Sequence, residues 1–169
     1  ITNSKDDVLL TVENLPAGSS VRLAVMDRFD GNVWNLSDST MSSDSSNYRR
    51  VGTSITNNAE GKKFTATFTV DKGLSVYWLP MAGAASSVTF DNSENSDSFY
   101  YNSDTMSAIY PSRTSEGLTY TETGIMPTVP TDKQIAKTDA AAISQPKAED
   151  VPDCVDKLAT AIAGGQSKG

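Results

Sequence analysis

Hydrophobic and polar residues alternate with a period of two over much of the first two-thirds of the chain, which indicates β-strands. The clearest case is Lys62 to Val70, where Phe64, Ala66, Phe68 and Val70 fall on one face and Lys63 and three threonines on the other. Val21 to Phe29 also alternates, and Asp30-Gly31 follows it. A two-residue Asp-Gly loop suits the type I′ turn of a β-hairpin, so we expect the chain to reverse there.

Further short strands are expected wherever an apolar or aromatic run is bounded by Asn, Asp, Ser, Pro or Gly. These runs are Asp7 to Glu13, Arg49 to Thr56, Leu74 to Leu79, Val88 to Phe90, Ser98 to Tyr101, Met106 to Tyr110 and Gly117 to Thr123. The second of them is expected to form a hairpin with Lys62 to Val70. Strands at this spacing predict a mainly β domain over residues 1–126, built as an antiparallel sheet or a sandwich.

Two regions differ from this pattern. The polar run Ser37 to Asn47 predicts a mobile surface loop. After Met126, prolines mark a linker over residues 127–150, with a short helix expected at Asp132 to Ile143. Residues 151–169 then predict a C-terminal helix, which has Pro152 in its first turn, Gly164 as a C-cap, and one apolar face formed by Val151, Val155, Leu158 and Ile162.

Composition excludes several classes of function. The formal net charge of −7 argues against a nucleic-acid partner, because phosphate binding requires a basic surface. The chain contains no histidine, which removes Ser-His-Asp and Cys-His catalysis and nearly all zinc sites. Its single cysteine, Cys154, cannot form an internal disulfide and is expected to be a buried or half-buried thiol. We therefore predict no cofactor, no metal and no catalytic residue in this chain.

Carboxylates near the predicted hairpin allow three interpretations. Asp27 and Asp30 could act as a catalytic pair, as opposed carboxylates do in glycosidases. The same two with Asn32 and Asp38 could hold calcium, although the spacing differs from that of an EF-hand loop. The interpretation that we favour is structural, with Asp30 and Gly31 forming the turn and Arg22 paired with Asp27 to fix the hairpin.

Aromatic residues offer a possible ligand surface at Tyr77, Trp78, Tyr100 and Tyr101, where a sugar or a peptide could stack. Adjacent residues of a strand point to opposite faces, so at least one aromatic residue in Tyr77-Trp78 and in Phe99 to Tyr101 should belong to the core. Trp34 follows the predicted turn and is expected to be a core side chain that covers the end of the sheet.

One stretch resembles a known family. Val21-Arg22-Leu23, Asp27, Phe29-Asp30-Gly31 and Trp34 resemble a signature of bacterial transglutaminase-like membrane proteins, with the actinobacterial members nearest. Two weaker similarities follow in the same order. Gly117 to Tyr120 resembles a late strand of the family's β-rich region, and Val151 to Ile162 resembles the helix that opens its catalytic core.

This resemblance implies an extracytoplasmic β-rich region that lies between membrane helices and a papain-like core, in a protein anchored to the cell membrane. The family's catalytic residues lie beyond the opening helix, so Cys154 is not the nucleophile. The start at Ile1, without Met or a signal region, leads us to expect a piece of a longer chain. The implied function is a noncatalytic module that positions or presents substrate, with the core and membrane helices of its own chain as partners. The alternative is a binding module for a cell-wall polymer or a protein.

Overall fold

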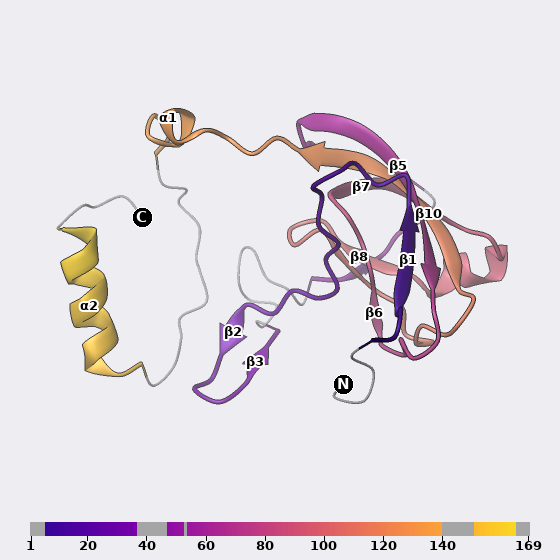
Figure 1. Ribbon diagram of the computed structural model, residues 1–169, viewed down its shortest axis with the longest axis horizontal. Coiled ribbons are helices and arrows are strands. Elements are labelled where there is room, and N and C mark those ends of the chain that lie inside the picture. Colours follow the sequence, from indigo (N-terminus) through magenta and orange to yellow (C-terminus); the bar gives the residue numbers. More distant parts are fainter. Residues whose placement is uncertain (1–5, 37–46, 53, 140–150, 165–169) are drawn as a thin grey trace. The chain divides into compact units, whose positions relative to one another are not determined.

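The protein is mainly β, as the alternating pattern predicts, and its strand pairs are all antiparallel in the computed structural model, which describes residues 6–36, 47–52, 54–139 and 151–164 (Figure 1). Its contacts divide into two units: residues 1–25 with 47–128, called the β unit below, and residues 26–46 with 129–169. The elements are β1 (Leu10–Glu13), β2 (Arg28–Phe29), β3 (Trp34–Asn35), β4 (Arg49–Arg50), β5 (Gly61–Val70), β6 (Trp78–Leu79), β7 (Ala84–Phe90), the 3₁₀ helix η1 (Ser93–Ser98), β8 (Tyr100–Asn102), β9 (Ser107–Ile109), β10 (Thr119–Pro127), α1 (Asp132–Ile135) and α2 (Asp153–Ala163).

The β unit contains two four-stranded sheets. The first has the strand order β1-β5-β10-β7 and the second the order β4-β8-β9-β6. The long strands β5 and β10 pair from Gly61 opposite Pro127 to Thr69 opposite Thr119, so they form the centre of the first sheet. Both sheets contribute buried side chains to one hydrophobic core, among them Phe68 and Tyr120 from the first and Leu79 and Tyr101 from the second.

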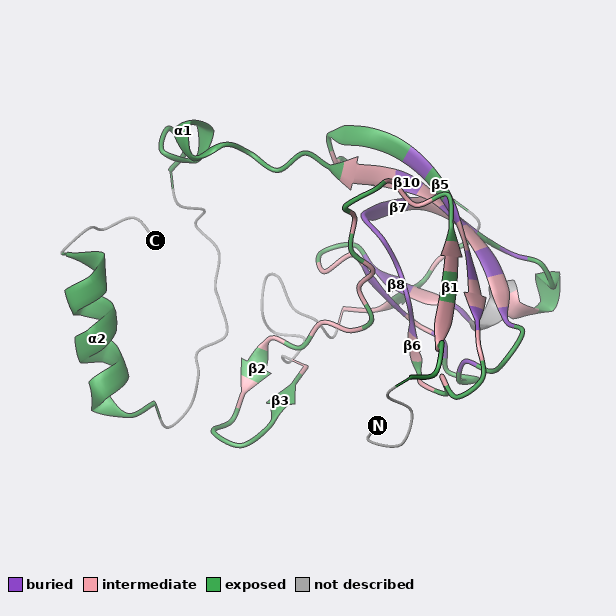
Figure 2. Cartoon of the chain, in the orientation of Figure 1, coloured by how far each residue is buried: buried purple, intermediate pink, exposed green. Residues whose placement is uncertain are grey.

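The alternation in β5 gives the two faces that the sequence predicts. Phe64, Ala66, Phe68 and Val70 are all buried, and the Phe68 ring stacks on that of Tyr120 at 5.1 Å. Figure 2 colours the chain by burial and shows buried stretches within this sheet. On the opposite face the threonines of β5 and β10 meet as hydroxyl pairs, of which Thr65 and Thr123 are the closest at 3.1 Å. One face of this sheet is therefore apolar and the other carries hydroxyl ladders.

The predicted hairpin between Arg49 to Thr56 and Lys62 to Val70 is wrong. β5 pairs with β1 and β10, whereas β4 pairs with β8. The connecting segment is instead held along β7, because the Asn57 side chain donates to the Ala85 carbonyl at 2.8 Å and the Ile55 N–H donates to the Ser86 carbonyl at 2.7 Å. Strand partners distant in sequence thus replace the local one.

Residues 26–36 form the expected hairpin, but its loop lies one residue further along. β2 and β3 pair Phe29 with Trp34, and the Asp30 N–H donates to the Val33 carbonyl, so Gly31-Asn32 is the central pair. Of this loop only Gly31 has a positive φ, 98°, which excludes the predicted type I′ geometry with two such residues. The Asp30 carboxylate closes the loop by accepting from the N–H groups of Asn32 and Val33 at 2.9 and 2.8 Å.

Trp34 is not the core side chain that the sequence led us to expect. It is 57% exposed, and its ring contacts that of Phe29 across the hairpin at 5.2 Å. The hairpin has only two residue pairs, too few to enclose a ring of this size.

Replacement of Trp34 with Ala should therefore lower the free energy of unfolding by no more than about 1 kcal/mol, the scale of an exposed cross-strand pair. Thermal unfolding followed by circular dichroism measures this change, with Phe68→Ala as a buried comparison that should cost about 3–5 kcal/mol. A loss of stability at Trp34 comparable to that at Phe68 would contradict the exposed position.

Both C-terminal helices are shorter than predicted. α1 spans only Asp132–Ile135, and residues 140–150 of the predicted linker lie outside the described residues, as do residues 37–46 of the predicted loop. α2 ends at Gly164 in the left-handed conformation, as expected of a glycine C-cap. Its apolar stripe is exposed, from Val155 at 48% to Ile162 at 78%, and Cys154 is exposed rather than buried because α2 has no buried residue.

Candidate functional site

The segment from Met81 to Ala85 is where polar side chains converge inside the β unit. Its first residue pairs with Arg22 through reciprocal backbone hydrogen bonds of 2.7 and 2.9 Å. The Arg22 guanidinium donates to the Met106 carbonyl at 2.5 Å and lies 3.5 Å from the Gly83 carbonyl. Arg22 thereby ties three segments that are far apart in sequence.

Glu122 of β10 is a buried carboxyl group at this point of convergence. It is fully buried in the sheet, opposite Ala66 of β5 and Val88 of β7. Its Oε2 atom accepts from the Ala82 N–H at 2.8 Å, while Oε1 has no hydrogen-bond partner within the described part of the chain. Burial raises the pKa of Glu122 to about 8, against the smaller lowering effects of the Ala82 N–H and the Arg22 charge, so the group is largely protonated at neutral pH.

Two tyrosines complete this polar centre. The Tyr120 hydroxyl donates to the Pro80 carbonyl at 2.5 Å, and the Tyr101 hydroxyl accepts from the Ala85 N–H at 3.2 Å. Burial raises the pKa of both phenols, so both are neutral. Because Glu122 is fully buried and its Oε2 is bound to backbone, we interpret the centre as a structural clamp on residues 80–85 rather than an acid–base pair.

The five motif residues are divided between the two units. Arg22 belongs to the β unit, where its guanidinium bonds to main-chain carbonyls, whereas Asp27, Asp30, Gly31 and Trp34 belong to the hairpin of the second unit. The Asp27 N–H donates to the Asn35 carbonyl at 3.1 Å. Hydrogen bonds from Val33 and Asn32 lower the pKa of Asp30, which fits its role in the loop. Asp38 lies outside the described residues, and those described contain no cluster of three possible metal ligands.

The aromatic residues divide between the two faces of the second sheet. Trp78 and Tyr100 both lie opposite Ile109, so these three side chains form one half-buried row, whereas Tyr101 and Phe99 are each 2% exposed in the core. Tyr77 is 52% exposed, with the Arg113 guanidinium 4.9 Å from its ring centre. The expectation of one core aromatic thus holds for Phe99 to Tyr101 but is wrong for Tyr77-Trp78, because neither residue of that pair is buried.

Glu122 is not among the candidate residues predicted from the sequence, although the pattern of the chain contains a signal for it. Leu118, directly before β10, alternates with Tyr120 and Glu122 of that strand, so the three share one face. A glutamate in register with two apolar residues on the core face indicates a buried carboxyl group.

Comparison with known protein families gives a match over most of the chain. The model of the TgpA N-terminal domain matches residues 2–131, which cover the β unit and the hairpin. The chain belongs to the TgpA N-terminal domain family. The transglutaminase association of this family agrees with the resemblance of the Val21 to Trp34 stretch. No curated protein and no solved structure matches the chain.

The family region ends at Thr131, the residue before α1, so α1 and α2 lie outside it. Among the described residues, no helix is both long and apolar enough to cross a bilayer.

Proposed function

We propose that this TgpA N-terminal domain is a noncatalytic, extracytoplasmic module of a membrane-anchored transglutaminase-like protein, and that it positions substrate for a papain-like core that follows α2. The observation that carries the proposal is the family match, which covers the whole β unit and stops before the helices. The exposed apolar stripe of α2 supports it, since Val155, Leu158 and Ile162 offer a packing surface to a following domain.

An insertion that separates the module from the core tests this proposal in the full-length protein. About ten Gly/Ser residues placed between Pro130 and Thr131 would lie outside every strand and form a flexible spacer. The Michaelis constant for a polymeric substrate should rise, while kcat/KM for a small amide substrate should not change, because only the polymer needs the module. An equal loss for both substrates, or no change for either, would contradict a positioning role.

We expect the 169-residue chain by itself to show no transglutaminase or protease turnover. A thiol nucleophile needs a base to activate it, the chain has no histidine, and Cys154 lies on an exposed helix. Release of ammonia from a glutamine peptide in the presence of a primary amine measures the activity. Turnover that disappears in Cys154→Ala would show that this thiol is a nucleophile, and turnover that survives the change would reveal a different catalytic site.

The alternative is a binding module for a wall polymer or a protein, and the row of Trp78, Ile109 and Tyr100 favours it because aromatic rings can stack on a ligand. Cosedimentation with cell-wall fractions tests it. Binding that falls in Tyr100→Ala but not in the hairpin variant Trp34→Ala would support this row as the binding surface, and equal binding by both would contradict it.

A further inference from the structure

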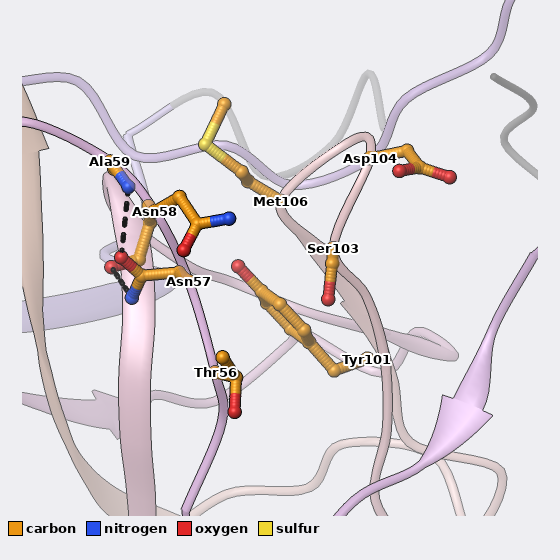
Figure 3. Close-up of a pocket in the computed structure, with 9 residues that line it drawn as sticks. Thr56, Asn57, Asn58, Ala59, Tyr101, Ser103, Asp104 and Met106 are labelled. Atoms are coloured by element: carbon orange, nitrogen blue, oxygen red, sulfur yellow. Dashed lines mark hydrogen bonds between the residues drawn. The ribbon is translucent and has the colours of Figure 1, made fainter.

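A cavity of about 330 Å³ lies in the β unit between residues 56–59 and the loop that joins β8 to β9 (Figure 3). Its rim is formed by exposed residues, among them Thr56, Asn58 and Ser103, and its inner wall by the buried residues Ala84 and Tyr101. This volume is at the lower end of the range of small-molecule sites, about 300–1,000 Å³, and suits a ligand the size of a mono- or disaccharide.

Hydrogen-bonding groups inside the cavity have unused capacity. The Tyr101 hydroxyl accepts from the Ala85 N–H, and its own proton has no acceptor among the described residues. Figure 3 shows this hydroxyl pointing toward the side chain of Asn58. Within the same described ranges, neither the Asn58 amide nor the Ser103 hydroxyl makes a hydrogen bond, whereas the Asn57 amide is occupied by Ala85, Ser86 and Ala59. A buried phenol that can donate thus lies beside an amide that can both donate and accept.

The wall that carries Ser103 is built rigidly. The fully buried Asn102 accepts from the N–H groups of Asp104 and Thr105 at 2.9 and 3.2 Å. Met106 closes the loop with a φ of 52°, and Arg22 holds its carbonyl. A non-glycine residue in this conformation persists only where its surroundings impose it, so the loop keeps the shape of the cavity before any ligand arrives.

The side chains that line the cavity favour a neutral ligand over an anionic one, and the nearest cation, Arg22, is engaged with the Met106 carbonyl. Among the residues that the structure describes, no lysine or arginine lines it. The carboxylate of Asp104 points away from the other labelled side chains (Figure 3), and the Asn47 amide lies 3.4 Å from it. What remains is a neutral set of hydroxyl and amide groups beside the apolar surfaces of Ala59, Ala84 and Met106. Saccharides have the complementary combination of hydroxyl edges and apolar C–H faces.

We infer that this cavity binds a neutral saccharide unit, with Tyr101 and Asn58 as its hydrogen-bonding residues. The inference rests on the proposed function, since it names the chemical class of ligand that the module would hold. The site is separate from the row of Trp78 and Tyr100, because Tyr101 lies on the opposite face of the same strand.

Titration calorimetry of the whole chain with two probes, tetra-N-acetylchitotetraose and maltotetraose, tests this inference and separates amino-sugar glycans from glucans. At least one probe should bind saturably. Asn58→Ala, an exposed position, and Tyr101→Phe should each weaken binding about 2- to 10-fold, the value of one hydrogen bond. The matched variants Asn32→Ala and Tyr110→Phe lie outside the cavity and should bind like the parent.

Absence of binding by both probes, or an unchanged affinity in Asn58→Ala, would overturn the inference. Binding of a glutamine-containing peptide that is lost in the same two variants would also overturn the inference, because it would indicate a protein ligand. If no saccharide binds but the spacer after Pro130 raises the Michaelis constant, the saccharide site fails and the positioning role stands. If a saccharide binds but the spacer has no effect on the Michaelis constant, the saccharide site stands and the positioning role fails.

Discussion

Glu122→Gln should make the folded chain more stable than the parent at pH 8 and leave the two almost equally stable at pH 4. Burial raises the pKa of Glu122 to about 8 in the folded chain, against 4.5 for an ordinary glutamate. Between these values the folded parent holds a proton that the unfolded chain has released, so its stability falls as pH rises, by about 1.4 kcal/mol for each pH unit. Glutamine has no such proton and removes this dependence.

The charged and titratable groups that act on Glu122 are Arg22, Tyr101 and Tyr120, and both tyrosines stay neutral over this range. Arg22 lowers the pKa of Glu122, but less than burial raises it. The stabilisation of the protonated carboxyl is therefore complete below about pH 4.5 and lost as pH approaches 8.

Urea unfolding at several pH values measures this difference between variant and parent. Glu116→Gln, at an exposed position, is the matched control and should follow the parent throughout. If the advantage of Glu122→Gln stays constant from pH 4 to pH 8, or reverses at high pH, the buried carboxyl is ionised, with Arg22 as its counter-charge.

Gly83→Ala should destabilise the β unit by more than about 2 kcal/mol. The added methyl group would strain a left-handed backbone conformation and would also collide with neighbouring atoms. Gly83 has a φ of 47°, which L residues rarely adopt, and a Cβ there would lie 2.4 Å from the Ile125 carbonyl oxygen and 2.9 Å from the Phe64 ring. Relief requires movement of β7 away from β10, where Gly124 makes a similar close approach to the Ala84 carbonyl. The same movement would displace the carbonyl beside Arg22.

Two further glycine variants separate strain from contact. Gly117 has a positive φ of 85° but open space around it, so Gly117→Ala should cost only about 1 kcal/mol. Gly52 has neither constraint, and Gly52→Ala should be close to neutral. The melting temperatures of the three variants, measured by thermal unfolding, should be lowest for Gly83→Ala and highest for Gly52→Ala. A Gly83→Ala protein that melts like Gly117→Ala would mean that the strands accommodate the methyl group freely.

Patterns along the chain predict faces better than partners. The face of β5 that carries Phe64 and Phe68 follows from the two-residue period alone, because one side of a sheet must be buried. Its pairing with β1 and β10 does not, because hydrogen bonds between strands are made by backbone that is the same in every strand. The local hairpin expected for residues 49–70 failed for this reason, and because Asn57 is bonded to β7 instead.

Aromatic residues show the same limit. Trp34 is expected in the core on its size, yet a hairpin of two residue pairs leaves it 57% exposed. Tyr101 was named with Tyr77 and Trp78 as one possible surface, whereas the structure puts it against the cavity with Asn58 and Met106. Asn58 lies far from Tyr101 in the sequence, and Met106 lies in the loop that follows the strand of Tyr101. No local sequence pattern therefore connects these three residues.

The Michaelis constant of the full-length protein for its polymeric substrate, measured for the double variant Asn58→Ala/Tyr101→Phe, tests most directly whether the β unit holds what the catalytic core acts on. The control is Asn32→Ala/Tyr110→Phe, with the same chemical changes outside the cavity. We predict a Michaelis constant raised about tenfold or more, the effect of two lost hydrogen bonds, with kcat unchanged. A lower kcat at constant KM, or equal constants for variant and control, would contradict this account.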